Sequence, residues 1–232
     1  KIVAFGSETR ESLEKISKSH RGAIIVLSES ARNISEGGFN INSNFTAQRM
    51  AELAKMDGAI IIDSKMKKIL YANTLLAPDL KIKSKETGTK HRAAERTAKQ
   101  LGVIVLVVSE KSSVISIYYN DKKYILNDLT ELLYKAREAI ENLEGQKSEL
   151  DLILKRFDSL EVSSLVNIED LAQIINKLIL FFKDAENGLI YVAELGKHGE
   201  TLRTRFNLAT SIFRDEIANL KLDYGRYFNM EK

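Results

Sequence analysis

The chain has no cysteine, and it has only one proline and three histidines among its 232 residues. Without cysteine no disulfide can form, and a zinc site built from histidine and cysteine is excluded as well. The longest apolar run, near Val103–Val108, is far shorter than the roughly 20 residues of a membrane-spanning helix. The first residues, Lys1–Phe5, lack the pattern of a signal peptide. We therefore expect a soluble, cytoplasmic protein with no membrane partner.

Charge of either sign is nearly balanced. The 35 Lys and Arg residues against 32 Asp and Glu residues leave a formal net charge of +3. This excess is too small to indicate nucleic-acid binding by itself. With 44% hydrophobic residues, the chain is long enough to build one large or two smaller domains.

Two short motifs, about thirty residues apart, are the most informative part of the sequence. The first, Asp57–Ala59, follows the amphipathic segment Thr46–Met56 and opens the apolar run Ala59–Ile62. This order predicts that the carboxylate of Asp57 lies at the start of a buried strand.

The second motif, Thr87–Arg92, combines threonines next to glycine with the basic triplet Lys90–Arg92. It leads into Ala93–Lys99, which has a helical pattern. Backbone N–H groups at the start of a helix, next to cationic side chains, are suited to binding phosphate.

Neither motif is specific when it stands alone. An aspartate before a glycine is usually a turn former, and Lys81–Lys90 could be a solvated basic loop. A single histidine such as His91 is more often a surface residue than a catalytic one. The order, the spacing and the flanking sequence of the two motifs therefore carry the functional interpretation.

With their neighbours Gly37–Phe39, Glu52–Ile60, Ile69–Asn73 and Glu86–Arg96, the two motifs resemble those of the diadenylate cyclase domain family. The resemblance is strongest over residues 21–126 and extends by pattern into the helical remainder. It implies that two ATP molecules are condensed to cyclic di-AMP, with release of two pyrophosphates. It also implies that the reaction site forms where two cyclase domains meet face to face.

The resemblance assigns a role to each matching position. Asp57 would bind a divalent metal, Mg²⁺ or Mn²⁺, and assist the attacking ribose 3′-hydroxyl, and His91 and Arg92 would complete the catalytic set. Gly58 and Leu76 would line the adenosine. The positions that match the family's ATP site are Gly58, Leu76, Thr89, Lys90, His91, Arg92 and Ser109.

The chain departs from the family pattern at two places, and these departures leave a second interpretation open. Lys90 stands where the family usually has arginine, so the bidentate fork of a guanidinium is lost. Glu110–Ser112 stands where the family often has arginines. Because one lost transition-state donor costs roughly 3 kcal/mol, or about a hundredfold in rate, the alternative is a nucleotide-binding sensor without turnover.

The predicted fold class is α/β, with a mixed sheet flanked by helices in residues 1–126 and an all-α bundle or spine in residues 127–232. The first helix should cover Glu8–Ser19, and Asn120–Asp121 should form a hairpin turn. The predicted strands are Gly22–Leu27, Ala59–Asp63, Lys68–Ala72, Val103–Ser109, Val114–Tyr119 and Lys122–Leu126.

The second part should be a bundle of three or four helices. Asn127 is predicted to cap the first helix, and Asn167 to cap Ile168–Lys183. Segment 174–182 is apolar almost all round, which fits burial between helices or against another subunit. The other predicted helical segments are Leu129–Leu143, Leu150–Leu160, Ile190–Leu195 and Leu202–Leu222.

The family resemblance also bears on assembly and on DNA. It implies a homo-oligomer, expected to be an octamer, in which the helical part acts as a spine. Because the chain starts at Lys1 and shows no helix-hairpin-helix pattern, we expect a fragment or a truncated relative, which would bind DNA only if the intact protein carries such a module. A third interpretation is a scaffold that binds DNA through Lys197, Arg203, Arg205 and Arg214.

Overall fold

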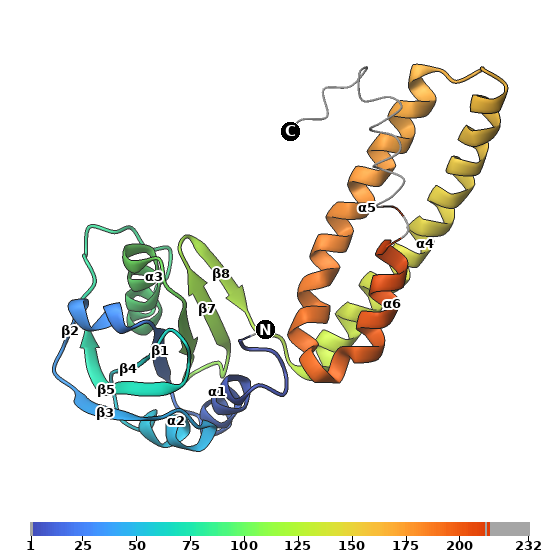
Figure 1. The fold of residues 1–232 in the computed structure, drawn as a ribbon. Helices are drawn as coiled ribbons and strands as arrows, with labels where there is room; N and C mark the ends of the chain where they lie inside the picture. Colours follow the sequence, from blue (N-terminus) through green and yellow to red (C-terminus); the bar gives the residue numbers. More distant parts are fainter. Residues whose placement is uncertain (1, 212, 214–232) are drawn as a thin grey trace. The chain divides into compact units, whose positions relative to one another are not determined.

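The computed structural model describes residues 2–211 and 213. The chain divides into two compact units (Figure 1). Gly6–Asn127 form an α/β unit, and the described residues from Asp128 onward form a helical unit together with Val3–Phe5. The predicted fold class, a mixed sheet with helices followed by an all-α region, is confirmed.

The α/β unit is built on one eight-stranded sheet with the order β2-β5-β4-β1-β6-β7-β8, and β3 also pairs with β5. Only the β1–β4 pair is parallel among the pairs described; the others are antiparallel. The strands are β1 (Ala23–Leu27), β2 (Ser35–Glu36), β3 (Phe39–Asn44), β4 (Ala59–Ile62), β5 (Lys68–Leu76), β6 (Val105–Val108), β7 (Ile115–Tyr119) and β8 (Lys122–Ile125). The helices are α1 (Glu8–Lys18), the short 3₁₀-helix η1 (Glu29–Ile34), α2 (Ala47–Leu53) and α3 (Thr89–Leu101).

The three central strands form the core of this unit. Every residue of β1, β4 and β6 is buried, as expected for continuous apolar runs that are covered on both faces. Ala94 and Ala98 of α3 pack with Ile24 and Val107 on one face. Figure 1 shows the α1–α2 pair on the other face. Small alanines at the contact let α3 approach the sheet closely, and this holds the start of α3 beside the strand ends.

Two strands were not predicted, and one is longer than predicted. The residues of β2 and β3 are mostly exposed, and β3 has only two hydrophobic residues, Phe39 and Ile41, so neither strand has the continuous apolar run of the central strands. Both are held by backbone pairing to β5. β5 continues to Leu76 rather than ending at Ala72, and this extension brings Leu76 to the functional site described below.

The helical unit contains three described α-helices. They are α4 (Leu129–Val162), α5 (Ile168–Leu195) and α6 (Glu200–Ser211), with the 3₁₀-helix η2 (Gly196–Gly199) before α6. The predicted cap Asn127 is wrong, because the side chain of Asp128 accepts the hydrogen bond from the N–H of Glu131. Asn167 caps α5 as predicted.

Helices α4 and α5 are continuous where the sequence pattern suggested breaks. α4 runs through Gly145, so Leu150–Leu160 is part of it and not a separate helix. α5 runs through Gly188, where an added Cβ would lie 3.2 Å from Phe206 and 3.3 Å from Ala139. A glycine inside a helix is tolerated where it allows close packing, and this explains why Gly188 does not end α5.

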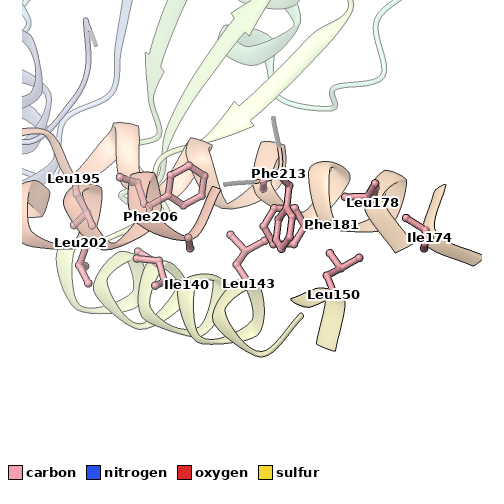
Figure 2. Close-up of a cluster of buried hydrophobic side chains, with 14 of the residues drawn as sticks. Ile140, Leu143, Leu150, Ile174, Leu178, Phe181, Leu195, Leu202, Phe206 and Phe213 are labelled. Atoms are coloured by element: carbon pink, nitrogen blue, oxygen red, sulfur yellow. The ribbon is translucent and has the colours of Figure 1, made fainter. Parts of the chain in front are cut away.

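Large apolar side chains from all three helices fill the core of the helical unit (Figure 2). Phe181 is fully buried and meets the ring of Phe213 edge-to-face at a centroid distance of 5.0 Å. Within the segment that the sequence shows as apolar all round, Ile174 and Leu178 are buried but Ile179 is 60% exposed. Burial inside the unit therefore accounts for only part of that segment.

Part of the predicted helix Leu202–Leu222, and Arg214 with it, lies outside the described residues. None of the helices in the described part of the chain has a stretch long and apolar enough to cross a lipid bilayer.

Candidate functional site

A cavity of about 240 Å³ lies where the loop before β4, the end of β5 and the start of α3 come together. It contains five of the residues selected from the sequence, namely Asp57, Gly58, Leu76, Thr89 and Lys90. Its other lining residues are Ile24, Ala59, Thr74, Leu75 and Ala93. The two motifs, which are distant in the sequence, therefore share one cavity.

The Asp57-Gly58 pair lies in the loop between α2 and β4. Gly58 has a φ of +96°, and a Cβ there would lie 2.9 Å from the carbonyl oxygen of Thr74. Glycine is therefore required for this loop to lie against β5. The close approach leaves Asp57 exposed at the edge of the cavity, where its carboxylate can reach a bound ligand.

The second motif forms the first turn of α3. The helix begins at Thr89, four residues earlier than the sequence pattern showed, and Gly88 has no side chain with which to cap it. The N–H of Arg92 donates to the carbonyl of Gly88 at 2.8 Å, so the N–H groups of the preceding residues have no acceptor within the helix. These N–H groups and the positive end of the helix dipole favour an anion at this edge of the cavity.

Lys90 lines the cavity, and its ammonium donates to the carbonyl oxygen of Gly22 at 3.3 Å. A Cβ added to Gly22 would lie 3.1 Å from Lys90 Nζ and 3.2 Å from Glu110 Cβ. The two positions that depart from the family pattern, Lys90 and Glu110, thus lie next to each other beside the start of β1.

Three of the sequence-selected residues are not among the lining residues of the cavity. His91 is half-buried, and its Nδ1 lies 2.8 Å from the hydroxyl of Tyr118; burial lowers the pKa of His91, although Glu86 opposes this shift. Arg92 is exposed on α3. Ser109 follows β6, and its hydroxyl accepts a long hydrogen bond of 3.4 Å from the N–H of Ser112.

The structure also shows site residues that sequence reasoning missed. Thr74 is fully buried, and its hydroxyl donates to the carbonyl of Ala59 at 3.0 Å, joining the ends of β4 and β5. Leu75, 65% exposed, supplies an apolar wall. The alternating burial along β5 continues through both residues, so a longer period-two pattern was the available signal.

Glu95 of α3 holds the long loop 77–88 that precedes the second motif. It is 7% exposed and accepts hydrogen bonds from the Ser84 hydroxyl and, at 2.9 Å, from the N–H of Lys85, while Lys99 pairs with it at 2.8 Å. Burial by itself would raise the pKa of Glu95, but the bonds from Lys99, Ser84 and Lys85 lower it to about 2. Glu95 is therefore ionised and keeps this loop in place.

Metal binding would depend on Asp57 together with groups from outside the chain. Among residues 2–211 and 213, no three His, Asp or Glu side chains are grouped closely enough to hold a metal ion. Within the part of the chain that the structure describes, Asp57 is the only carboxylate that lines the cavity. Mg²⁺ commonly binds through one or two carboxylates, with substrate phosphates and water as its other ligands, and one exposed aspartate beside an anion-binding helix start fits this pattern.

Two family models match this chain, one over each of its two units. The family model described as the nucleotide-binding region of the DisA bacterial checkpoint controller matches residues 10–123, and the model of its linker region matches residues 126–231. The DNA integrity scanning protein DisA of Clostridium kluyveri is 40% identical over 227 residues, which cover 97% of this chain and 64% of that protein. The Bacillus subtilis protein of the same name is 37% identical, with coverage of 96% and 62%. Among solved structures, a double mutant of DacA from Staphylococcus aureus matches 52% of this chain and 85% of its own, with 25% identity and a TM-score of 0.42.

The two family models, together with the fold, identify a nucleotide-binding α/β domain followed by a helical linker. The chain belongs to the DisA family. It spans about 64% of the length of the relative from Clostridium kluyveri.

Proposed function

We propose that the α/β unit is a diadenylate cyclase domain. In the reaction, the ribose 3′-oxygen of each ATP attacks the α-phosphorus of the other, two pyrophosphates leave, and cyclic di-AMP forms. The observation that carries the proposal is the cavity itself, which gathers a carboxylate, an apolar wall and an uncapped helix start. Phosphoryl transfer depends mainly on positioning and charge compensation, and these groups can supply both.

The cavity suggests how one ATP is bound. The apolar side chains of Leu75 and Leu76, with the backbone of Gly58, would hold the adenosine. The triphosphate would extend toward Thr89 and Lys90 at the start of α3. His91, Arg92 and Ser109 stay proposed phosphate contacts; because they lie outside the lining of the cavity, they would act on phosphates that extend beyond it.

Asp57 would hold the divalent cation, Mg²⁺ or Mn²⁺. Such an ion would polarise the α-phosphate and offset its negative charge when it is bound. The carboxylate of Asp57 is exposed on the cavity edge, next to Gly58 and the proposed adenosine position, where it could also orient the attacking hydroxyl.

The reaction needs two nucleotides, so the proposal includes a second cyclase domain facing the first. A homo-oligomer is therefore part of the proposed function, and an octamer is the expected form. We do not include DNA binding in the proposed function; of the candidate cations, Arg205 is paired with Glu144 at 2.8 Å.

Purified protein incubated with ATP and Mg²⁺ or Mn²⁺, followed by chromatography and mass spectrometry, tests the proposal. The Asp57→Asn variant keeps the shape of the side chain and should lose turnover by at least a hundredfold while it still binds ATP. Asp158→Asn, an exposed change on α4, is the matched control and should be unaffected. An Asp57→Asn variant with the parent rate would remove this residue from the mechanism.

A nucleotide-binding sensor without turnover is the second candidate. It is favoured by one observation: the ammonium of Lys90 is engaged by the Gly22 carbonyl and lies near Glu110 instead of an arginine. ATP binding without cyclic di-AMP, with either metal, would establish this candidate and reject the cyclase.

A further inference from the structure

The side chain of His91 is hydrogen-bonded to that of Tyr118, and this contact lies outside the roles proposed so far. Its hydroxyl oxygen is 2.8 Å from His91 Nδ1, and the two rings meet edge-on with centroids 6.1 Å apart. Tyr118 lies on β7 and is only 1% exposed, in the core that α3 covers. Because Tyr118 is buried and held in a strand, its hydroxyl has a fixed position and can orient the ring of His91 on the first turn of α3.

Two charged residues surround the phenol ring. Lys123 is the cross-strand neighbour of Tyr118 on β8, and its ammonium lies 5.7 Å from the centre of the Tyr118 ring. Lys123 also pairs with Glu86 at 2.7 Å, which ties the loop before α3 to β8. The environment of Tyr118 is therefore set by three different segments of the α/β unit.

This environment determines the protonation states of Tyr118 and His91. Burial raises the pKa of Tyr118, and the negative charge of Glu86 and a hydrogen bond with its carboxylate raise it further, so the phenol keeps its proton throughout the physiological range. Glu86 therefore competes with His91 for the phenol proton, and the short 2.8 Å separation from Nδ1 favours donation to His91. Burial also lowers the pKa of His91, so its imidazole is neutral at pH 7. A neutral imidazole has one donor and one acceptor nitrogen, and the hydrogen bond at one nitrogen determines the state of the other.

The opposite side of the imidazole points toward the start of α3. His91 Cδ2, which is bonded to Nε2, lies 3.6 Å from where a Cβ on Gly88 would be. Gly88 precedes the uncapped N–H groups of the helix. The ring edge that carries Nε2 therefore faces Gly88, and from this edge His91 would reach phosphates that extend beyond the cavity.

We propose that Tyr118 is a positioning residue, whose hydroxyl donates to His91 Nδ1 and holds the imidazole in the Nε2–H form that donates to a phosphate oxygen of ATP. The phosphate contact rests on the proposed function, whereas the tautomer does not. Tyr118 itself does not touch the substrate in this scheme.

The test compares Tyr118→Phe with Tyr119→Phe in the full 232-residue chain. The first change removes the hydroxyl but keeps the buried ring. The second removes the same group from the adjacent residue, which is 48% exposed. Circular dichroism and thermal unfolding of both variants verify that the fold is retained.

The decisive readout is ¹⁵N nuclear magnetic resonance of the imidazole nitrogens. The chain has only three histidines, so His91 can be assigned with a His91→Gln variant. In the parent and in Tyr119→Phe we expect a protonated Nε2 and an unprotonated Nδ1. In Tyr118→Phe we expect a mixture of tautomers. A parent His91 protonated on Nδ1, or a Tyr118→Phe spectrum that matches the parent, would overturn the proposal.

Two further measurements separate this inference from the cyclase assignment. ATP added in the presence of EDTA should shift the His91 Nε2 signal, and no shift would refute the phosphate contact. In the cyclase assay, Tyr118→Phe should lower kcat about tenfold and change KM by less than twofold. If the parent makes no cyclic di-AMP but its tautomer depends on Tyr118, the proposed activity fails while the positioning role stands.

Discussion

Replacing Glu95 with glutamine should destabilise the α/β unit in a pH-dependent manner. Glu95 is nearly buried and receives bonds from Ser84, from the N–H of Lys85 and from Lys99. Glutamine keeps the shape of the side chain but not its negative charge. The change therefore removes the charge-assisted part of all three interactions and leaves the packing in place.

The magnitude follows from the shifted pKa. The pKa of Glu95 falls from its ordinary value of 4.5 to about 2 in the folded protein. A shift of this size corresponds to about 3 kcal/mol of the free energy of unfolding at pH 7. The variant should lose roughly this amount.

The sign of the pH dependence is set by the direction of the shift. A lowered folded pKa means that the stabilisation is complete above about pH 4.5 and is lost as the pH falls toward 2, because the unfolded chain then binds the proton first. The difference between parent and variant should thus shrink to less than half at pH 3. Glutamine does not titrate, so the variant contributes nothing to this change.

Urea unfolding at pH 7, 4 and 3, followed by far-ultraviolet circular dichroism, measures the difference. Hydrogen–deuterium exchange of residues 77–101 should show faster exchange in the variant, since this segment is held by Glu95. Glu52→Gln is the matched control: the exposed side chain of Glu52 on α2 pairs with the exposed Lys55 just after the helix, and the loss of this pair should cost at most about 0.5 kcal/mol. Equal differences at pH 7 and pH 3, or a loss no larger than in the control, would refute the reasoning.

Two further predictions concern backbone and core. Gly58→Ala should lower ATP affinity at least tenfold and the free energy of unfolding by about 2 kcal/mol, because the added Cβ would lie 2.9 Å from the carbonyl oxygen of Thr74 at a positive φ. The control is Gly145→Ala in the middle of α4, where an added Cβ meets nothing within 4 Å. This change should raise the free energy of unfolding by about 0.5–1 kcal/mol. Isothermal titration and urea unfolding measure these effects, and equal results for both glycines would contradict them. Phe181→Ala should cost about 3–5 kcal/mol of unfolding free energy, since the ring is fully buried against Phe213, and a loss below about 1 kcal/mol would show that this core is not formed as described.

Local features were predictable from the sequence because neighbouring residues determine them. The buried strands are continuous apolar runs, and Asn167 caps α5 by a bond to the N–H groups two and three residues ahead. The Asn120–Asp121 turn joins β7 and β8, with Asn120 at a positive φ that asparagine tolerates. Failures occurred where local rules were ambiguous: Asn127 and Asp128 are equally good caps, and only the backbone geometry selects Asp128.

The edge strands depend on backbone partners that a local sequence pattern does not reveal. β2 and β3 have little apolar character, and they exist because β5 offers them backbone partners. The same holds for Gly188, which looks like a helix break until α6 is packed against it. In each case a partner that is distant in the sequence supplies the free energy.

Local motifs were enough to predict which types of residue make up the candidate site, whereas the packing of the folded chain brings particular members of that set together. Asp57 and Thr89 share a cavity because β4 and β5 are antiparallel neighbours and the loop held by Glu95 returns the chain to the same edge of the sheet. His91 and Tyr118 meet because α3 packs on β7. No local pattern encodes these contacts, since they depend on strand order and on which helix covers which face, and these are settled only when the whole core packs.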